Sequence, residues 1–182
     1  MSPPHACVAH LVSKHLSLLL DLDISTGVLD LACGSGRNGL FVLRHKLPVT
    51  FADNNDSALE EITKAIEGPE SKCRATIWNV DFELLDKAPL NDKCFDAVLV
   101  FNYLHRPLFS AIRNAVRPGG LIFYERFTIS QRKYGRPCNP EYLLNPGELK
   151  QCFDGWKILY YAEGEMSDPK RASASLIARK PH

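Results

Sequence analysis

The sequence predicts an α/β protein with a doubly wound, mostly parallel sheet of seven strands, in which the last strand runs antiparallel. Segments with strand and helix patterns alternate along most of the chain, and this order builds such a sheet through right-handed crossovers. Residues 95–101 form a nearly continuous apolar run, as expected of a central strand buried on both faces. The last two strand-like segments have no helix between them, so they should pair antiparallel.

Each element is assigned from its local pattern. The strand-like segments are 28–32, 49–52, 75–80, 95–101, 121–124, 156–163 and 173–180. The helical segments are 8–22, 37–47, 55–67, 108–116 and one that opens at 145–148, where Glu148 can reach back to a capping Asn145. Turns are expected where Gly68-Pro69 stops a helix and where residues 117–120 lead into the fifth strand.

The size and composition of the chain fit a single soluble domain that covers residues 1–182. The chain is 45% hydrophobic and 24% charged, and its formal net charge of +1 points to no particular partner. No apolar run approaches the roughly 18 residues that a transmembrane helix needs. The N-terminus, where a helix is expected within residues 1–25, lacks a signal-peptide pattern. We therefore expect a cytoplasmic protein that does not enter a membrane.

The cysteines and histidines do not predict a metal site. The six cysteines include no C-x-x-C pair, so they are interpreted as reduced, inert thiols. His5, His10 and His15 are five residues apart, which puts neighbours roughly 140° apart on a helix. They cannot share one metal ion on one helix face, and no metal is expected.

The candidate binding residues follow the predicted strands, because open α/β sheets bind ligands beyond the carboxyl ends of their strands. In chain order these residues are Gly34, Ser35, Gly36, Asp53, Asn54, Asp81, Phe82, Asn102, Tyr103, His105 and Glu125.

The loop after the first strand has the pattern of a nucleotide-binding loop. Gly34 and Gly36 let the backbone turn tightly and approach a ligand, and Gly39 lets the next helix lie close to the strand. Asp53, 19 residues after Gly34, is placed to accept the hydroxyls of a ribose. The same G-x-G-x-x-G pattern is the dinucleotide fingerprint, so an NAD(P)-dependent oxidoreductase is one reading of this loop.

Two features favour a different ligand. Asp30 lies inside the first strand, at the base of the loop, where a carboxylate suits an ammonium group and is a poor neighbour for a pyrophosphate. About 57 residues remain after Glu125, too few for the substrate domain of a dehydrogenase.

The motifs resemble those of class I S-adenosylmethionine-dependent methyltransferases, in order and over nearly the whole chain. Residues 28–36 match the first motif, with Ala32 where the family more often has glycine, and residues 81–82, 95–98 and 117–120 match later motifs. The resemblance implies a Rossmann-like methyltransferase fold with S-adenosylmethionine as cofactor. The cofactor-binding residues that it implies are Asp30, Ala32, Gly34, Gly36, Asn38, Asp53, Asn54, Asp81, Phe82 and Phe101. Residues 36–38 resemble the small bacterial tellurite-resistance methyltransferases.

Methyl transfer from a sulfonium is an in-line displacement, so the protein mainly aligns the acceptor and excludes water. His105 is a candidate general base, although it could instead close the loop before the next helix. Tyr103 is a candidate catalytic residue that could form an aromatic wall beside the sulfonium.

Residues 126–146 follow the fifth strand and are interpreted as a lid over the active site. The part from Arg126 to Pro140 carries four basic residues and no acid, which suits an anionic acceptor, or RNA if it extends into a groove. A solvated loop is the alternative. Because net charge is near neutral, a small-molecule acceptor is preferred to nucleic acid. A non-catalytic module that binds S-adenosylmethionine remains a further alternative.

Overall fold

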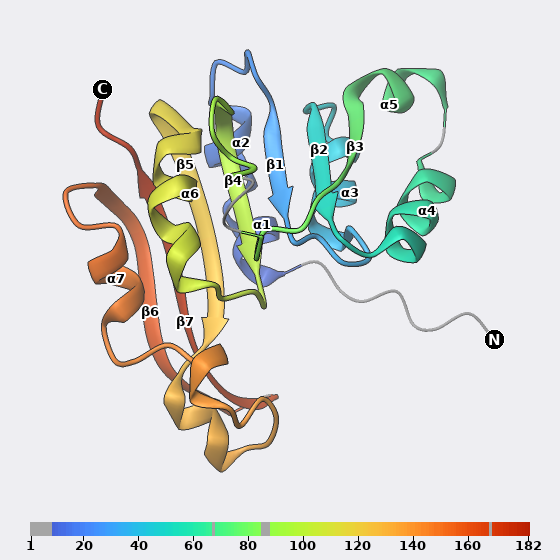
Figure 1. Cartoon of the computed structure of the whole chain (residues 1–182). Coiled ribbons are helices and arrows are strands. Elements are labelled where there is room, and N and C mark those ends of the chain that lie inside the picture. The colour runs from blue at the N-terminus through green and yellow to red at the C-terminus, as the bar shows by residue number, and fades with distance from the viewer. Residues whose placement is uncertain (1–8, 67, 85–87, 168) are drawn as a thin grey trace.

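The computed structural model describes residues 9–66, 68–84, 88–167 and 169–182, in which seven strands form one sheet (Figure 1). Their spatial order is β3-β2-β1-β4-β5-β7-β6. Strands β1 to β5 are parallel, and β7 is antiparallel to both of its neighbours, which confirms the predicted fold class. The strands are β1 (Val28–Leu31), β2 (Val49–Asp53), β3 (Ala75–Asn79), β4 (Phe95–Phe101), β5 (Val116–Phe127), β6 (Lys157–Ser167) and β7 (Lys170–Arg179).

Helices cover both faces of the sheet. Figure 1 shows α6 and α7 in front of the sheet and α1, α2 and α3 behind it. The helices of the described residues are α1 (His10–Lys14), α2 (Leu16–Leu20), α3 (Arg37–Arg44), α4 (Asp56–Ala65), α5 (Pro69–Arg74), α6 (Phe109–Ala115) and α7 (Glu148–Cys152). Strand β4 is buried along its whole length. Its side chains alternate between two hydrophobic clusters, with Val98 in one and Leu99 in the other.

The N-terminal helix is shorter than predicted and is divided in two. Residues 1–8, where the predicted helix begins, lie outside the described residues. The rest forms α1 and α2, which are separated at His15, where φ is −114° and ψ is 25°. The His15 ring packs against Tyr160 of β6, with 4.9 Å between ring centroids. Leu11, Val12 and Leu19 are buried as the helical spacing predicted.

Two helix ends differ from the prediction. Helix α3 ends at Arg44, and Lys46 then takes a left-handed conformation with φ 66°. Leu47 is buried, but it lies after the end of the helix and not within it. Asn55 caps α4, since its Oδ1 accepts from the Ala58 N–H at 3.1 Å. Pro69 was expected to stop this helix. It instead opens α5, because proline is well suited to the first position of a helix.

The segment before the main part of β5 and the start of α7 agree only in part with the prediction. Residues 117–120 were expected as a turn before the fifth strand, but they form an irregularity within β5. Phe95 pairs with Val116 and Ala97 pairs with Leu121, so these four residues loop out of the ladder. The Glu148 carboxylate accepts from the Asn145 N–H at 2.7 Å as predicted, although α7 itself begins only at Glu148.

Strands β6 and β7 form the predicted antiparallel pair and extend further than expected at the turn between them. None of the helices in the described ranges is both long and apolar enough to cross a membrane.

Candidate functional site

A cavity of about 400 Å³ lies at the carboxyl ends of β1, β2 and β4. All but one of the predicted cofactor-binding residues line it: Asp30, Ala32, Gly34, Asn38, Asp53, Asn54, Asp81, Phe82 and Phe101. Tyr103 lines the cavity as well. Gly36 and His105 are not among the residues that line it.

Two glycines of the loop after β1 and the start of α3 lie too close to neighbouring side chains to carry a Cβ. Gly36 has φ 67°, and a Cβ there would lie 2.7 Å from Ile62 of α4, so its function is to allow packing. A Cβ at Gly39 would lie 2.4 Å from the Phe51 ring, which confirms that Gly39 brings α3 close to the sheet. A Cβ at Gly34 would meet no atom within 4 Å. Ala32, where glycine is more common in the family, has φ 50°, a conformation that favours glycine.

Asp30 is a buried carboxylate at the base of the cavity. It is only 2% exposed, and its Oδ2 accepts from the Gly39 N–H at 2.8 Å. Burial raises the pKa of Asp30 to about 7, and the Gly39 N–H and the Arg37 charge only partly offset this rise. The carboxylate thus occupies the first turn of α3, where a dinucleotide-binding protein would hold a pyrophosphate.

Asp53, the last residue of β2, ties two loops together. Its Oδ2 accepts from the Gly34 N–H at 2.8 Å, and its Oδ1 accepts from the Asn55 N–H at 3.0 Å. Each carboxylate oxygen has a second lone pair, so both can still accept a hydroxyl from a ligand in the cavity.

The electrostatics of the cavity favour a cationic ligand. Four carboxylates line it, from Asp30, Asp53, Asp81 and Glu83, and Arg37 is the basic residue among the lining side chains. A sulfonium with an ammonium tail fits this charge, whereas the two negative charges of a pyrophosphate do not. The residues present therefore fit S-adenosylmethionine.

The loop after β4 brings Tyr103 to the cavity with its hydroxyl unused. The Tyr103 hydroxyl oxygen is inaccessible and has no hydrogen-bond partner within the described part of the chain. Burial raises the pKa of this phenol well above its usual value, and the nearby Glu83 and Asp81 raise it further. Tyr103 therefore stays protonated at neutral pH and can donate a hydrogen bond into the cavity. The Nε2 atom of His105 is also buried without a partner in those residues, but away from the cavity lining.

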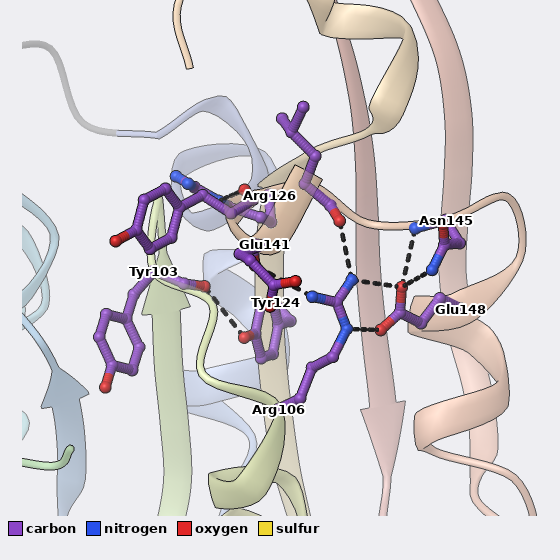
Figure 2. Close-up of polar contacts among 9 residues, drawn as sticks. Tyr103, Arg106, Tyr124, Arg126, Glu141, Asn145 and Glu148 are labelled. Carbon is purple, nitrogen blue, oxygen red and sulfur yellow. Dashed lines mark hydrogen bonds and ion pairs between the residues drawn. The ribbon is translucent and has the colours of Figure 1, made fainter. Parts of the chain in front are cut away.

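Two side chains of β5 donate hydrogen bonds to backbone carbonyls of this loop. Asn102 has φ 60°, a left-handed conformation that is uncommon for a residue with a side chain, and its carbonyl accepts from Arg126. The Tyr103 carbonyl accepts from the Tyr124 hydroxyl at 3.0 Å (Figure 2). The Tyr103 side chain points away from Arg106 in the same view.

The segment between β5 and α7 is fastened to the same loop by Arg106 (Figure 2). The Arg106 guanidinium pairs with Glu148, with 2.6 Å between Nε and Oε1. It also donates to the carbonyls of Glu141 at 3.0 Å and Leu143 at 2.8 Å. Two short 3-10 helices, Ile129–Lys133 and Pro140–Tyr142, lie in this segment, beyond the carboxyl end of β5 (Figure 1).

The basic residues of this segment are partly engaged within the protein. Arg126 is only 8% exposed and donates to the carbonyls of Tyr142 and Asn102. Lys133 pairs with Glu165 of β6 at 2.8 Å. Two of the four positive charges that suggested an anion-binding lid are therefore committed to internal contacts.

The sheet order, the reversed β7 and the acidic cavity together define the class of S-adenosylmethionine-dependent methyltransferases. Residues 28–120, half of the chain, match the family described as a methyltransferase domain. The chain belongs to this family of enzymes, whose cofactor is S-adenosylmethionine, and this decides against the nicotinamide reading of the glycine loop.

Curated relatives are similar at the level of 24–26% identity. The probable S-adenosyl-L-methionine-dependent methyltransferase TehB of Haemophilus influenzae is 24% identical over 165 residues, which cover 84% of this chain and 57% of TehB. Glycine N-methyltransferase of Mus musculus is 26% identical over 171 residues, 85% of this chain and 53% of the relative. The chain thus spans about half the length of the curated relatives that it matches.

Solved structures share the fold. The crystal structure of TehB from Haemophilus influenzae has a TM-score of 0.67 at 22% identity, covering 93% of this chain and 61% of that one. The glycopeptide N-methyltransferase MtfA complexed with S-adenosyl-L-methionine has a TM-score of 0.63 at 19% identity, and the match covers both chains completely. At these identities the likeness shows the fold alone.

The cavity also contains residues that the sequence reasoning did not single out as binding residues. Cys33, Arg37, Val80 and Glu83 line it. All of them are neighbours of predicted residues, so a wider window around each strand end would have included them.

Proposed function

We propose that the protein transfers the methyl group of S-adenosylmethionine to a small-molecule acceptor. The observation that carries the proposal is the acidic cavity with the buried Asp30 at its base. When bound, the cofactor supplies an activated methyl group, which bonds to a lone pair of the acceptor while the electrons of the broken bond stay on sulfur. The acceptor proton leaves to solvent or to a base.

The chain's own residues have distinct parts in this proposal. Asp30 binds the ammonium group of the cofactor, and Asp53 accepts its ribose hydroxyls. Asp81 and Phe82 bind the adenine. Tyr103 keeps its proton and forms a wall beside the reacting centre, from which its free hydroxyl can donate a hydrogen bond. His105 as a general base would need access that the cavity lining does not give it.

A small acceptor is favoured over nucleic acid on two grounds. The carboxylates around the cavity repel a phosphate backbone, and Arg126 and Lys133 are already engaged. One curated relative, glycine N-methyltransferase, is named for a small-molecule acceptor.

The test begins with calorimetric titrations of S-adenosylhomocysteine and NADH. We expect S-adenosylhomocysteine to bind and NADH not to bind; the reverse result would refute the proposal. Turnover is then measured as S-adenosylhomocysteine release with panels of carboxylate, thiol, amine and oligonucleotide acceptors. Cofactor binding without turnover on any panel would favour the non-catalytic alternative.

Replacement of Asp53 by alanine should weaken S-adenosylhomocysteine binding at least tenfold. Two charge-assisted hydrogen bonds to the ribose would be lost, and each contributes about 1.5–3 kcal/mol. The Gly34 N–H would also lose its acceptor. Asp56→Ala on the adjacent α4 is the control and should bind normally. Unchanged affinity of the Asp53 variant would show that this carboxylate does not contact the cofactor.

A further inference from the structure

A second cavity, of about 210 Å³, lies on the α1 face of the sheet. Its floor is polar: Glu125 of β5 and Ser173 and Ser175 of β7 replace the apolar residues that occupy this face further along the same strands. Ser173 and Ser175 are 6% and 9% exposed. His15 of α1 and Tyr160 of β6 contribute to the wall. A floor with these hydroxyl and carboxylate groups suits a polar ligand rather than an apolar one.

One residue of the second cavity lies beside one residue of the first. Phe101 lines the cofactor cavity, and Glu125, in the floor of the second cavity, is its direct neighbour across the parallel pair β4–β5. Neighbouring residues of paired strands project to the same face, so the two side chains lie next to each other. The Ala9 N–H donates to Asn38 Oδ1 at 2.9 Å, which joins the start of α1 to another residue of the cofactor cavity.

Arg171 presents unused hydrogen-bond donors to the second cavity. Its Nε contacts the Met166 sulfur at 3.2 Å. Its Nη2 lies 3.9 Å from Glu125 Oε1, too far for a hydrogen bond. Neither η nitrogen has a hydrogen-bond acceptor among the residues that the structure describes. A guanidinium with both of these groups available matches the two oxygens of a carboxylate.

Glu163 and Glu165 also line this cavity, and both carboxylates are engaged by groups that do not line it: Glu163 accepts from the Gly147 N–H at 3.0 Å, and Glu165 pairs with Lys133. Glu125 Oε2 already accepts from the Ser175 hydroxyl at 2.8 Å, so this acid is partly satisfied without the ligand. His15 Nε2 is inaccessible and has no partner in the described ranges. Lys14 lies 5.9 Å from the centre of the Tyr160 ring and adds a positive charge at the rim.

From these observations we propose that the second cavity is the acceptor site and that it binds a small carboxylate, whose two oxygens pair with Arg171. This inference rests on the proposed function, because it assigns the acceptor of that reaction. The volume is below the roughly 300–1,000 Å³ of pockets for drug-sized ligands, so the acceptor is a compact molecule. In this proposal Arg171 binds the negative charge of the acceptor, and the basic segment after β5 does not.

The test is an NMR titration of the protein saturated with S-adenosylhomocysteine, with acetate as the probe and neutral acetamide as its isostere. We expect acetate to shift the backbone amides of residues 171–175 with a Kd of about millimolar, and acetamide to leave them unshifted. Arg171→Leu should raise the acetate Kd about tenfold or more, because a bidentate charged contact is lost. Arg171→Lys should give an intermediate value, since it keeps the charge but not the planar fork. Arg44→Leu on α3, outside both cavities, is the control.

Affinity for S-adenosylhomocysteine separates the two proposals. It should be the same in the Arg171 variants as in the wild type, which also shows that they fold. Normal cofactor binding together with acetate shifts that are absent, or that survive Arg171→Leu, would overturn the acceptor site and leave the methyltransferase proposal intact. Loss of cofactor binding in the wild type would instead overturn the proposed function.

Discussion

Replacement of Asp30 by asparagine is expected to weaken S-adenosylhomocysteine binding by about a hundredfold or more at pH 8. The carboxylate is 2% exposed and lines the cofactor cavity, so an ammonium group beside it would form a buried ion pair. Removing one partner of a buried ion pair costs about 3–5 kcal/mol, because the other charge is left uncompensated. Isothermal titration calorimetry measures the loss directly.

The pH dependence of cofactor binding provides an independent readout. The pKa of Asp30 in the free protein is raised to about 7, mainly by burial, whereas an ammonium partner favours the ionised form. Wild-type affinity should therefore fall about tenfold per pH unit below 7, with proton release on binding. Asp30→Asn should show a flat profile between pH 6 and 8. A wild-type profile equally flat in this range would contradict the assigned ion pair.

The same substitution should have the opposite effect on stability. A carboxyl whose pKa is raised in the folded state stabilises the fold at low pH, and this contribution is lost as pH rises from about 4 to about 7. Without cofactor, Asp30→Asn should therefore melt at a higher temperature than the wild type at pH 8, and the difference should shrink at pH 5. Asp21→Asn, at an exposed position after α2, is the matched control.

The cofactor cavity could be predicted because strand ends determine it. Asp53 and Asp81 end or follow a short apolar segment, Asp30 lies one residue before the end of another, and the parallel order of the strands brings all three to one edge of the sheet. The packing of Gly36 could not be predicted in this way. Its backbone turns toward Ile62 of α4, and no pattern within the loop reports what packs behind it.

The functions of the basic residues could not be predicted for a different reason. Arg106 and Arg126 donate mainly to backbone carbonyls. Every residue has such a carbonyl, so the sequence cannot indicate which residues accept these hydrogen bonds. A count of charges between 126 and 140 therefore overestimates the positive charge that is available to a ligand. Arg171 shows the converse: it lies in a strand that gave no functional signal, and only the sheet order places it beside Glu125.

Replacement of Asp96 by alanine should lower the free energy of unfolding by about 3–5 kcal/mol, a large part of the roughly 5–15 kcal/mol of a typical domain. Asp96 is completely buried at the start of β4. Its Oδ2 accepts from the N–H groups of Ser25, Thr26 and Gly27 at 2.9, 2.7 and 2.6 Å, and its carboxylate also pairs with Arg117. Alanine would leave three backbone donors and a guanidinium without their acceptor.

Thermal and urea unfolding of the Asp96 variant would measure this loss, which corresponds to roughly 10 °C in melting temperature for a chain of this size. Asp154→Ala, at an exposed position after α7, should unfold like the wild type. Burial alone would raise the pKa of Asp96, but the three N–H groups and Arg117 hold it below 3.8. Its contribution is therefore present above about pH 4 and lost as the pH falls further, so the variant and the wild type should converge in acid. A difference that persists unchanged in acid would mean that the lost packing, and not the charged acceptor, holds the loop before β1 against β4.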